Sequence, residues 1–139
     1  MAVDKISLNN ADDAVTIVLD FLSDTLSAQS VSLGIIGAVQ LATEEAVVNI
    51  LSHGYHGGDG LIEVFCKVSE DAVTICIRDF APEFNPLDLP SPDIDADLLD
   101  RRIGGLGVHL IRSLMDDVRY KYTGSGNCLI FSKNQMPNE

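Results

Sequence analysis

The sequence contains no tryptophan, and aromatic residues make up only 6% of its 139 residues. Basic residues are also scarce, because nine lysines and arginines stand against 21 aspartates and glutamates, for a formal net charge of −12. A protein that binds nucleic acid needs a basic surface facing the phosphates, so this balance argues against a nucleic-acid partner. It does not exclude a nucleotide ligand, since a bound Mg²⁺ and a few backbone amides offset phosphate charge locally.

Long apolar runs and metal-binding cysteine pairs are missing as well. No apolar run approaches the roughly 18 residues of a membrane span, and the N-terminus lacks the features of a signal peptide. The three cysteines, Cys66, Cys76 and Cys128, are isolated in strand-like runs without CxxC spacing, so we expect each to pack as a small hydrophobic side chain. We therefore expect a soluble, cytoplasmic protein with no membrane segment.

What is present fits one domain, residues 1–139, with a single core. The apolar spacing predicts helices from Asn10 or Asp12, as N-cap, to about Leu26, from Ser30 or Ser32 to about His53, and over about Gly105–Met115. Alternation predicts strands at 5–8, Leu61–Val68, Ala72–Asp79, Val118–Tyr122 and Asn127–Lys133. This order predicts an α/β (α+β) two-layer sandwich, in which helices pack on one face of a mostly antiparallel sheet.

Residues 80–102 form a long segment without apolar periodicity, which holds four of the five prolines. A loop of this length in a compact domain is usually functional or disordered. A short helix is expected around Asp95–Arg101.

Glu45 and Asn49 lie one turn apart on the second predicted helix, at the margin of its apolar side. Asn49 offers a neutral oxygen that suits Mg²⁺, and Glu45 could act as a general base. Taken alone, the pair is better explained by a surface position for Glu45 and a capping or solvated position for Asn49. The neighbouring Glu44 points further from the apolar side and is expected at the surface.

Asp79 ends a strand in which alternation places it on the same face as Val73, Ile75 and Ile77. A carboxylate on such an apolar face needs hydrogen-bond donors, and the amino group of adenine is one. The alternative is an aspartate that forms the turn just past the strand.

A glycine-rich turn, Gly104-Gly105-Leu106-Gly107, precedes the third helix. The unpaired amides and dipole at a helix start suit a phosphate chain, although the turn is neither a Walker P-loop nor a Rossmann fingerprint. Flexible hinge glycines are the alternative. Arg101 and Arg102 could meet phosphate oxygens or neutralise nearby aspartates.

Other residues carry weaker signals. His53 and His56 are three apart, but no third ligand completes a metal site, and His109 is expected to pack or to donate a hydrogen bond. Leu41 and Val48 lie off the apolar side of their helix and could mark a partner surface.

The three motifs, in this order and with the long loop between the second and third, resemble the GHKL (Bergerat-fold) ATP-binding superfamily, and within it the anti-sigma-factor serine/threonine protein kinases. The N-box corresponds to Thr43–Tyr55, the G1-box to Ile77–Pro82 and the G2-box to Gly104–Ile111. The chain departs from the wider superfamily at Ala81-Pro82, where glycines are common, and at Asn127, where many members have threonine.

The resemblance implies that Asn49 binds Mg²⁺, that Glu45 is the base toward a substrate serine and that Asp79 holds adenine. It implies an ATP lid at residues 80–103. It assigns the remaining ATP contacts to Arg102, Gly104, Gly105, Leu106, Gly107 and Val108.

The resemblance further implies a homodimer, a sigma-factor partner and an anti-anti-sigma (STAS-domain) protein as the phosphorylated substrate. The function it predicts is therefore an ATP-dependent protein kinase that also sequesters a regulator. Two alternatives stay open, namely a nucleotide-dependent binding module without phosphotransfer and a small α/β domain that binds no nucleotide.

Overall fold

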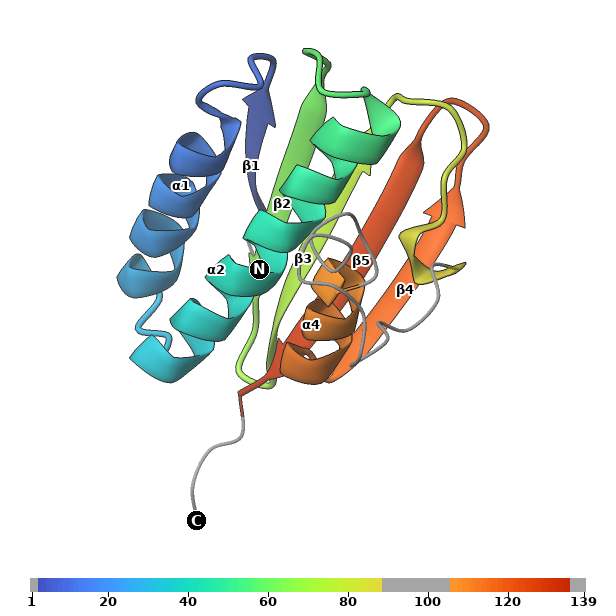
Figure 1. Ribbon diagram of the computed structural model, residues 1–139. Helices are drawn as coiled ribbons and strands as arrows, with labels where there is room; N and C mark the ends of the chain where they lie inside the picture. Colours follow the sequence, from blue (N-terminus) through green and yellow to red (C-terminus); the bar gives the residue numbers. More distant parts are fainter. Residues whose placement is uncertain (1–2, 89–105, 136–139) are drawn as a thin grey trace.

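The computed structural model describes residues 3–88 and 106–135 of the chain. In this part of the chain, three helices cover one face of a five-stranded sheet (Figure 1). The strands are β1 (Val3–Leu8), β2 (Ile62–Val68), β3 (Ala72–Asp79), β4 (Asp117–Tyr122) and β5 (Asn127–Asn134). The helices are α1 (Ala14–Ala28), α2 (Leu33–Asn49) and α4 (Leu106–Leu114), with a π-helix, η1 (Ile50–Gly54), and a 3-10 turn, η2 (Pro86–Asp88). The predicted two-layer α/β fold is confirmed.

The sheet brings together strands that are far apart in the sequence. Its order is β1-β2-β3-β5-β4, and each neighbouring pair is antiparallel. The last strand, β5, therefore lies between β3 and β4. Its register places Asp79, at the end of β3, opposite Asn127, at the start of β5, while Ile62 of β2 lies on the other side of Asp79.

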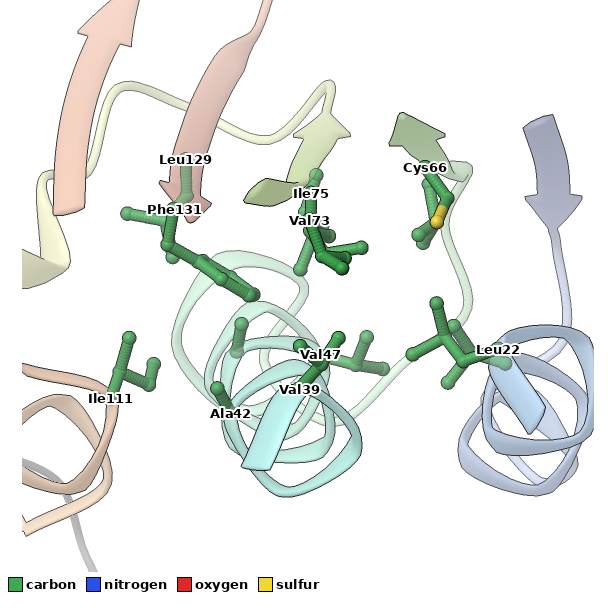
Figure 2. Close-up of a cluster of buried hydrophobic side chains, with 14 of the residues drawn as sticks. Leu22, Val39, Ala42, Val47, Cys66, Val73, Ile75, Ile111, Leu129 and Phe131 are labelled. Atoms are coloured by element: carbon green, nitrogen blue, oxygen red, sulfur yellow. The ribbon is translucent and has the colours of Figure 1, made fainter. Parts of the chain in front are cut away.

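The core lies between the sheet and the helices. Figure 2 shows side chains of the sheet, such as Ile75 and Phe131, meeting those of α2, such as Val39 and Val47. All four of these side chains have 0% exposure. Because residues of a strand point alternately to its two faces, Asp79 continues the buried, helix-facing row of β3.

The second helix, α2, begins and ends at polar residues. The Ser32 side chain accepts a long hydrogen bond of 3.4 Å from the backbone amide of Ile35 and caps the helix. At the other end the α-helix stops at Asn49, and the backbone amide of Tyr55 bonds the Ile50 carbonyl, five residues earlier. Such a π-turn inserts one extra residue into the helix and is frequent at functional sites.

The start of α1 differs from the prediction. Asp13, not Asn10 or Asp12, precedes the helix, and its side chain makes no capping bond. The Asn10 side chain instead accepts from the amide of Asp12 at 2.9 Å, and Asp59 accepts from the amide of Ala11 at 2.8 Å. The polar side chains before α1 therefore organise the loop rather than cap the helix.

The stretch Leu33–Gly54 is long and apolar enough to cross a membrane by length and composition alone. It is also the helix that supplies Val39, Ala42 and Val47, each with 0% exposure, to the core. Its apolar character is explained by its place in the middle of the helical layer.

The cysteines do not all behave as predicted. Cys66 is buried in the core with 1% exposure, as expected. Cys76 and Cys128 are not isolated, because their sulfur atoms lie 2.8 Å apart on the opposite face of the sheet. All three cysteines are free, as expected, but the contact was not predicted, because Cys76 and Cys128 are 52 residues apart in the sequence and meet only through the pairing of β3 with β5.

Candidate functional site

A pocket opens where the end of α2 and η1 meets the ends of β3 and β5. Counted to its open mouth, it holds about 380 Å³ of empty space. Its wall is formed by Ala46, Asn49, Ile50, Gly54, Asp79, Phe84, Pro86, Tyr120, Asn127 and Leu129. A mostly apolar pocket with a few convergent polar groups is typical of a small-molecule site.

Asn49 forms the helical side of this pocket. It is the last residue of α2 and is only 9% exposed. Its side-chain nitrogen is buried and has no hydrogen-bond partner in the described part of the chain. The assignment of nitrogen and oxygen in an amide is set by its surroundings, so one polar end of this amide lacks a protein partner. A buried amide left in this way is costly, and a ligand in the pocket would relieve that cost.

Glu45 lies one helical turn before Asn49, as predicted, but does not belong to the pocket wall. Burial raises the pKa of Glu45 above its ordinary value, and the charge of Glu44 acts in the same direction. A raised pKa makes the ionised carboxylate a better proton acceptor. Glu44 is half-buried like Glu45, so the expected difference in exposure between them is not observed.

Asp79 forms the sheet side of the pocket and is 5% exposed. One carboxylate oxygen, Oδ1, accepts from the side chain of Asn127 at 2.9 Å and from the amide of Ala81 at 3.0 Å. The bond to Ala81 is a turn of the kind weighed as the alternative role, so Asp79 both shapes the turn and faces the pocket. Burial raises the pKa of Asp79, while the bonds from Asn127 and Ala81 act in the opposite direction.

The other oxygen of Asp79, Oδ2, has no hydrogen-bond donor among the described residues. Among the described residues, the hydrogen bonds therefore leave one acceptor of this buried carboxylate open to a ligand that carries an N–H group. The amino group of adenine is such a ligand, and its contact with Asp79 stays a prediction.

Asn127 is the main residue of the pocket that the sequence analysis left without a role. Its side-chain nitrogen donates to Asp79 and to the carbonyls of Ala81 (3.2 Å) and Pro82 (3.1 Å). Its oxygen accepts from the amide of Phe84 (2.9 Å) and from the Tyr120 hydroxyl. One side chain thus fixes Asp79 and the first residues after β3. The sequence did contain a sign of this role, because Asn127 is a polar residue on the otherwise apolar, buried face of its strand, as Asp79 is on β3.

Gly126 and Tyr55 keep neighbouring segments of the chain close to the end of β3, beside the pocket. A Cβ atom on Gly126 would lie 2.3 Å from the Asp79 carbonyl oxygen, so only glycine fits there. The Tyr55 hydroxyl donates to the Leu61 carbonyl at 2.6 Å and accepts from the amide of Phe80 at 2.9 Å. Tyr55 therefore ties the residue after η1 to the end of β3.

The start of the predicted lid also contacts these elements. The ring of Phe84 stacks on His53 of η1 with 5.6 Å between centroids. Arg112 of α4 donates to the Leu87 carbonyl at 2.9 Å. The segment after Asp79 is thus anchored to both flanking helices.

The phosphate half of the predicted site is only partly described. Arg101, Arg102, Gly104 and Gly105 lie outside the described residues, as does the predicted helix at Asp95–Arg101. Leu106 and Gly107 form the first positions of α4. Val108, the next residue, is buried with 4% exposure, and α4 packs beside α2.

Among the weaker candidates, Leu41 and Val48 are exposed, as predicted, at 39% and 40%. His109 is exposed on α4, so of its two expected roles, packing and hydrogen-bond donation, packing is excluded. It lies on the solvent side of the helix, one residue beyond buried Val108. In the described ranges 3–88 and 106–135 no three His, Cys, Asp or Glu side chains cluster as metal ligands.

Comparison with known proteins identifies the family of this chain. Residues 8–133 match the model of the histidine kinase-like ATPase domain. The serine-protein kinase RsbW of Listeria monocytogenes is 34% identical over 106 residues, which are 73% of this chain and 68% of that protein. The serine-protein kinase RsbW of Staphylococcus aureus strain JH9 is 32% identical over 117 residues, which are 79% of this chain and 74% of that protein.

A solved structure shows the same fold. The crystal structure of the RsbU and RsbW domains of Rv1364c from Mycobacterium tuberculosis superposes with a TM-score of 0.65 at 17% sequence identity. The match covers 96% of this chain and about a third (33%) of that longer protein. The predicted resemblance is confirmed: the chain belongs to the family of histidine kinase-like ATPase domains.

Proposed function

We propose that this protein is an anti-sigma factor with serine/threonine protein kinase activity, which binds Mg-ATP and phosphorylates a serine of an anti-anti-sigma, STAS-domain protein. The observation that carries the proposal is the pocket whose wall includes both Asp79 and Asn49, with Glu45 one helical turn before Asn49. The proposal is supported by the two relatives, which are both serine-protein kinases and match most of this chain.

The adenine base would bind at Asp79. The Oδ2 oxygen, to which no described residue donates, would accept a hydrogen bond from the exocyclic amino group, while Asn127 and Ala81 hold Oδ1 in place. Because the carboxylate is buried and already oriented, little freedom is lost when the base binds.

The metal would bind at Asn49. Mg²⁺ typically takes one or two protein oxygens and completes its shell with water and substrate phosphates, so a single amide at the pocket wall is a suitable protein ligand. When bound, Mg²⁺ neutralises phosphate charge. The side-chain nitrogen of Asn49, which has no partner among the described residues, would be free to donate a hydrogen bond to the same ligand.

The phosphates would bind at the start of α4. Leu106 and Gly107 are its first residues, and the first amides of a helix have no partner within the helix. We assign Arg102, Gly104, Gly105 and Val108 to the same end of the nucleotide, as the family resemblance implies.

Glu45 would accept the proton of the substrate serine. Phosphoryl transfer depends on positioning and electrostatic stabilisation more than on covalent chemistry by the protein. The raised pKa of Glu45 suits a base.

The remaining elements of the proposal concern partners and location. We propose a sigma factor as the sequestered partner, a homodimer as the active assembly and the cytoplasm as the site of action. The exposed residues Leu41 and Val48 of α2 are candidates for contact with a partner.

The test is a phosphotransfer assay with Mg-ATP and a STAS-domain substrate. Glu45→Gln should lower transfer by at least about 100-fold, because general-base catalysis contributes factors of that order. Glu44→Gln, at the adjacent position, should transfer close to the wild-type rate. ADP affinity should be unchanged in both variants, which separates loss of the base from misfolding. Equal transfer by wild type and Glu45→Gln would remove Glu45 from the mechanism.

The second candidate function is a nucleotide-dependent binding module that holds its partner without phosphorylating it. The observation that favours it is that Glu45 lies outside the pocket wall, whereas Asn49 and Asp79 lie within it. Partner capture that depends on ATP, with no phosphate found on the partner, would select this function.

A further inference from the structure

Cys76 and Cys128 form an unusual contact on the face of the sheet opposite the helices. Their sulfur atoms lie 2.8 Å apart, and both cysteines are reduced. Cys76 of β3 is opposite Ile130, and Cys128 of β5 is opposite Arg78, so the two cysteines are diagonal neighbours. A disulfide bond is about 2.05 Å long, so bond formation needs an approach of only about 0.8 Å.

From this geometry we infer that Cys76 and Cys128 form a reversible disulfide that responds to hydroperoxides and locks β3 to β5. The inference is independent of the proposed kinase activity, because it rests on the opposite face of the sheet. Cys66, which lies in the core, takes no part in it.

The surroundings favour a thiolate at Cys128 and a thiol at Cys76, because the hydrogen bond between them and burial raise the pKa of Cys76. The hydrogen bond from Cys76 lowers the pKa of Cys128 to about 7, and the positive charges of Lys121 and Arg78 act in the same direction. Burial and the charge of Asp79 act in the opposite direction. By contrast, burial raises the pKa of Cys66 to about 11, so it remains a thiol at neutral pH.

An oxidant can reach the pair from the solvent side. Cys76 is half-buried, whereas Cys128 has only 5% exposure. All three described helices, α1, α2 and α4, lie on the other face of the sheet (Figure 1). Hydrogen peroxide is small enough to reach the half-buried Cys76 from the solvent, so the core does not need to open.

The chemistry balances with one peroxide for each pair. A thiolate sulfur attacks a peroxide oxygen, the O–O bond breaks, and the products are a sulfenic acid and, after protonation, water. The second thiol then attacks the oxidised sulfur, and the displaced hydroxide takes the thiol proton to form a second water. The two thiols lose two electrons, and the peroxide gains them.

The Cys76–Cys128 disulfide would lie close to the residues that form the pocket. Cys128 directly follows Asn127, and Cys76 lies three residues before Asp79. These strand ends carry the hydrogen bonds that hold Asp79. A covalent link beside them prevents β3 and β5 from separating. It also lowers the conformational entropy of the unfolded chain, which stabilises the folded domain.

The experiment uses the full chain, reduced and then treated with hydrogen peroxide equimolar to the protein. We expect an intramolecular mass loss of two hydrogens, mapped to the Cys76–Cys128 peptide pair and reversed by dithiothreitol. Cys66→Ser should behave like wild type, whereas Cys76→Ser and Cys128→Ser should not form the bond. Disulfide-linked dimers, or overoxidised Cys76 without an internal bond, would overturn the inference.

Two further readouts test the mechanism. The oxidation rate should rise about tenfold from pH 6 to pH 8 and then level off, with a midpoint near the pKa of about 7. A rate that keeps rising steeply above pH 8.5 would instead indicate ordinary thiols. The oxidised protein should melt about 5–15 °C higher than the reduced protein. A lower melting temperature would mean that the strands cannot accept the bond.

Discussion

Replacing Asn127 with alanine removes five hydrogen bonds from the pocket, to Asp79, Ala81, Pro82, Phe84 and Tyr120. The bond to the Asp79 carboxylate is charge-assisted and contributes about 1.5–3 kcal/mol, and each neutral bond contributes about 0.5–1.5 kcal/mol. Some of the freed groups will bond to water. Counting the Asp79 bond and two of the neutral ones, we expect the free energy of unfolding to fall by about 2.5–6 kcal/mol.

Urea denaturation followed by circular dichroism measures this loss. With a slope of about 1–3 kcal/mol per molar urea, the midpoint should fall by at least about 1 M. Asn134→Ala is the matched control, because Asn134 is an exposed residue at the other end of β5. Its effect should stay within about 0.5 kcal/mol. If the two variants were equally stable, Asn127 would not be the residue that organises the pocket.

Two more perturbations test how the pocket is built. Gly126→Ala places a Cβ atom 2.3 Å from the Asp79 carbonyl and should lower the free energy of unfolding by about 1–3 kcal/mol. Gly34→Ala is the control, because a Cβ atom there meets no other atom within 4 Å, and it should raise the free energy of unfolding by about 0.5–1 kcal/mol. If thermal melts showed both variants shifted in the same direction, the packing argument would be refuted. Asp79→Asn should keep both accepted hydrogen bonds while it removes a buried charge. Because the folded-state pKa of Asp79 is raised, wild type loses stability as the pH rises from just below 4 through that pKa. The variant should therefore be more stable than wild type at pH 7 but not at pH 3, and it should bind ADP poorly in equilibrium dialysis. Equal pH profiles for the two proteins would contradict this account.

The sequence carried enough information to predict the parts of the fold that depend on local periodicity. The alternation of Val73, Ile75 and Ile77 was sufficient to place Asp79 on the buried face of β3, which the structure confirms. The helical spacing likewise placed Asn49 at the margin of the apolar side of α2. These patterns extend over a few residues, and each is enforced by the cost of exposing or burying a side chain.

What the sequence did not reveal depends on which strands are neighbours. The contact between Cys76 and Cys128 and the role of Asn127 both require β5 to lie beside β3, with a particular register. Strand order is decided by the packing of the whole sheet, and no local pattern encodes it. The exposure of His109 was missed for a smaller reason, since it sits next to buried Val108 on a helix of only nine residues.

The π-turn after Asn49 makes the spacing of residues there as important as their identity. The amide of Tyr55 reaches back five residues to Ile50, so η1 contains one residue more than a regular α-helical turn would use. Adding one more residue within Ile50–Gly54 would turn the side chain of Tyr55 by roughly 100° relative to Asn49, and Tyr55 would lose Leu61 as a partner. Removing one residue would instead restore an ordinary α-helical turn and leave Tyr55 in its present direction. In this segment, an insertion is therefore a more severe mutation than a deletion.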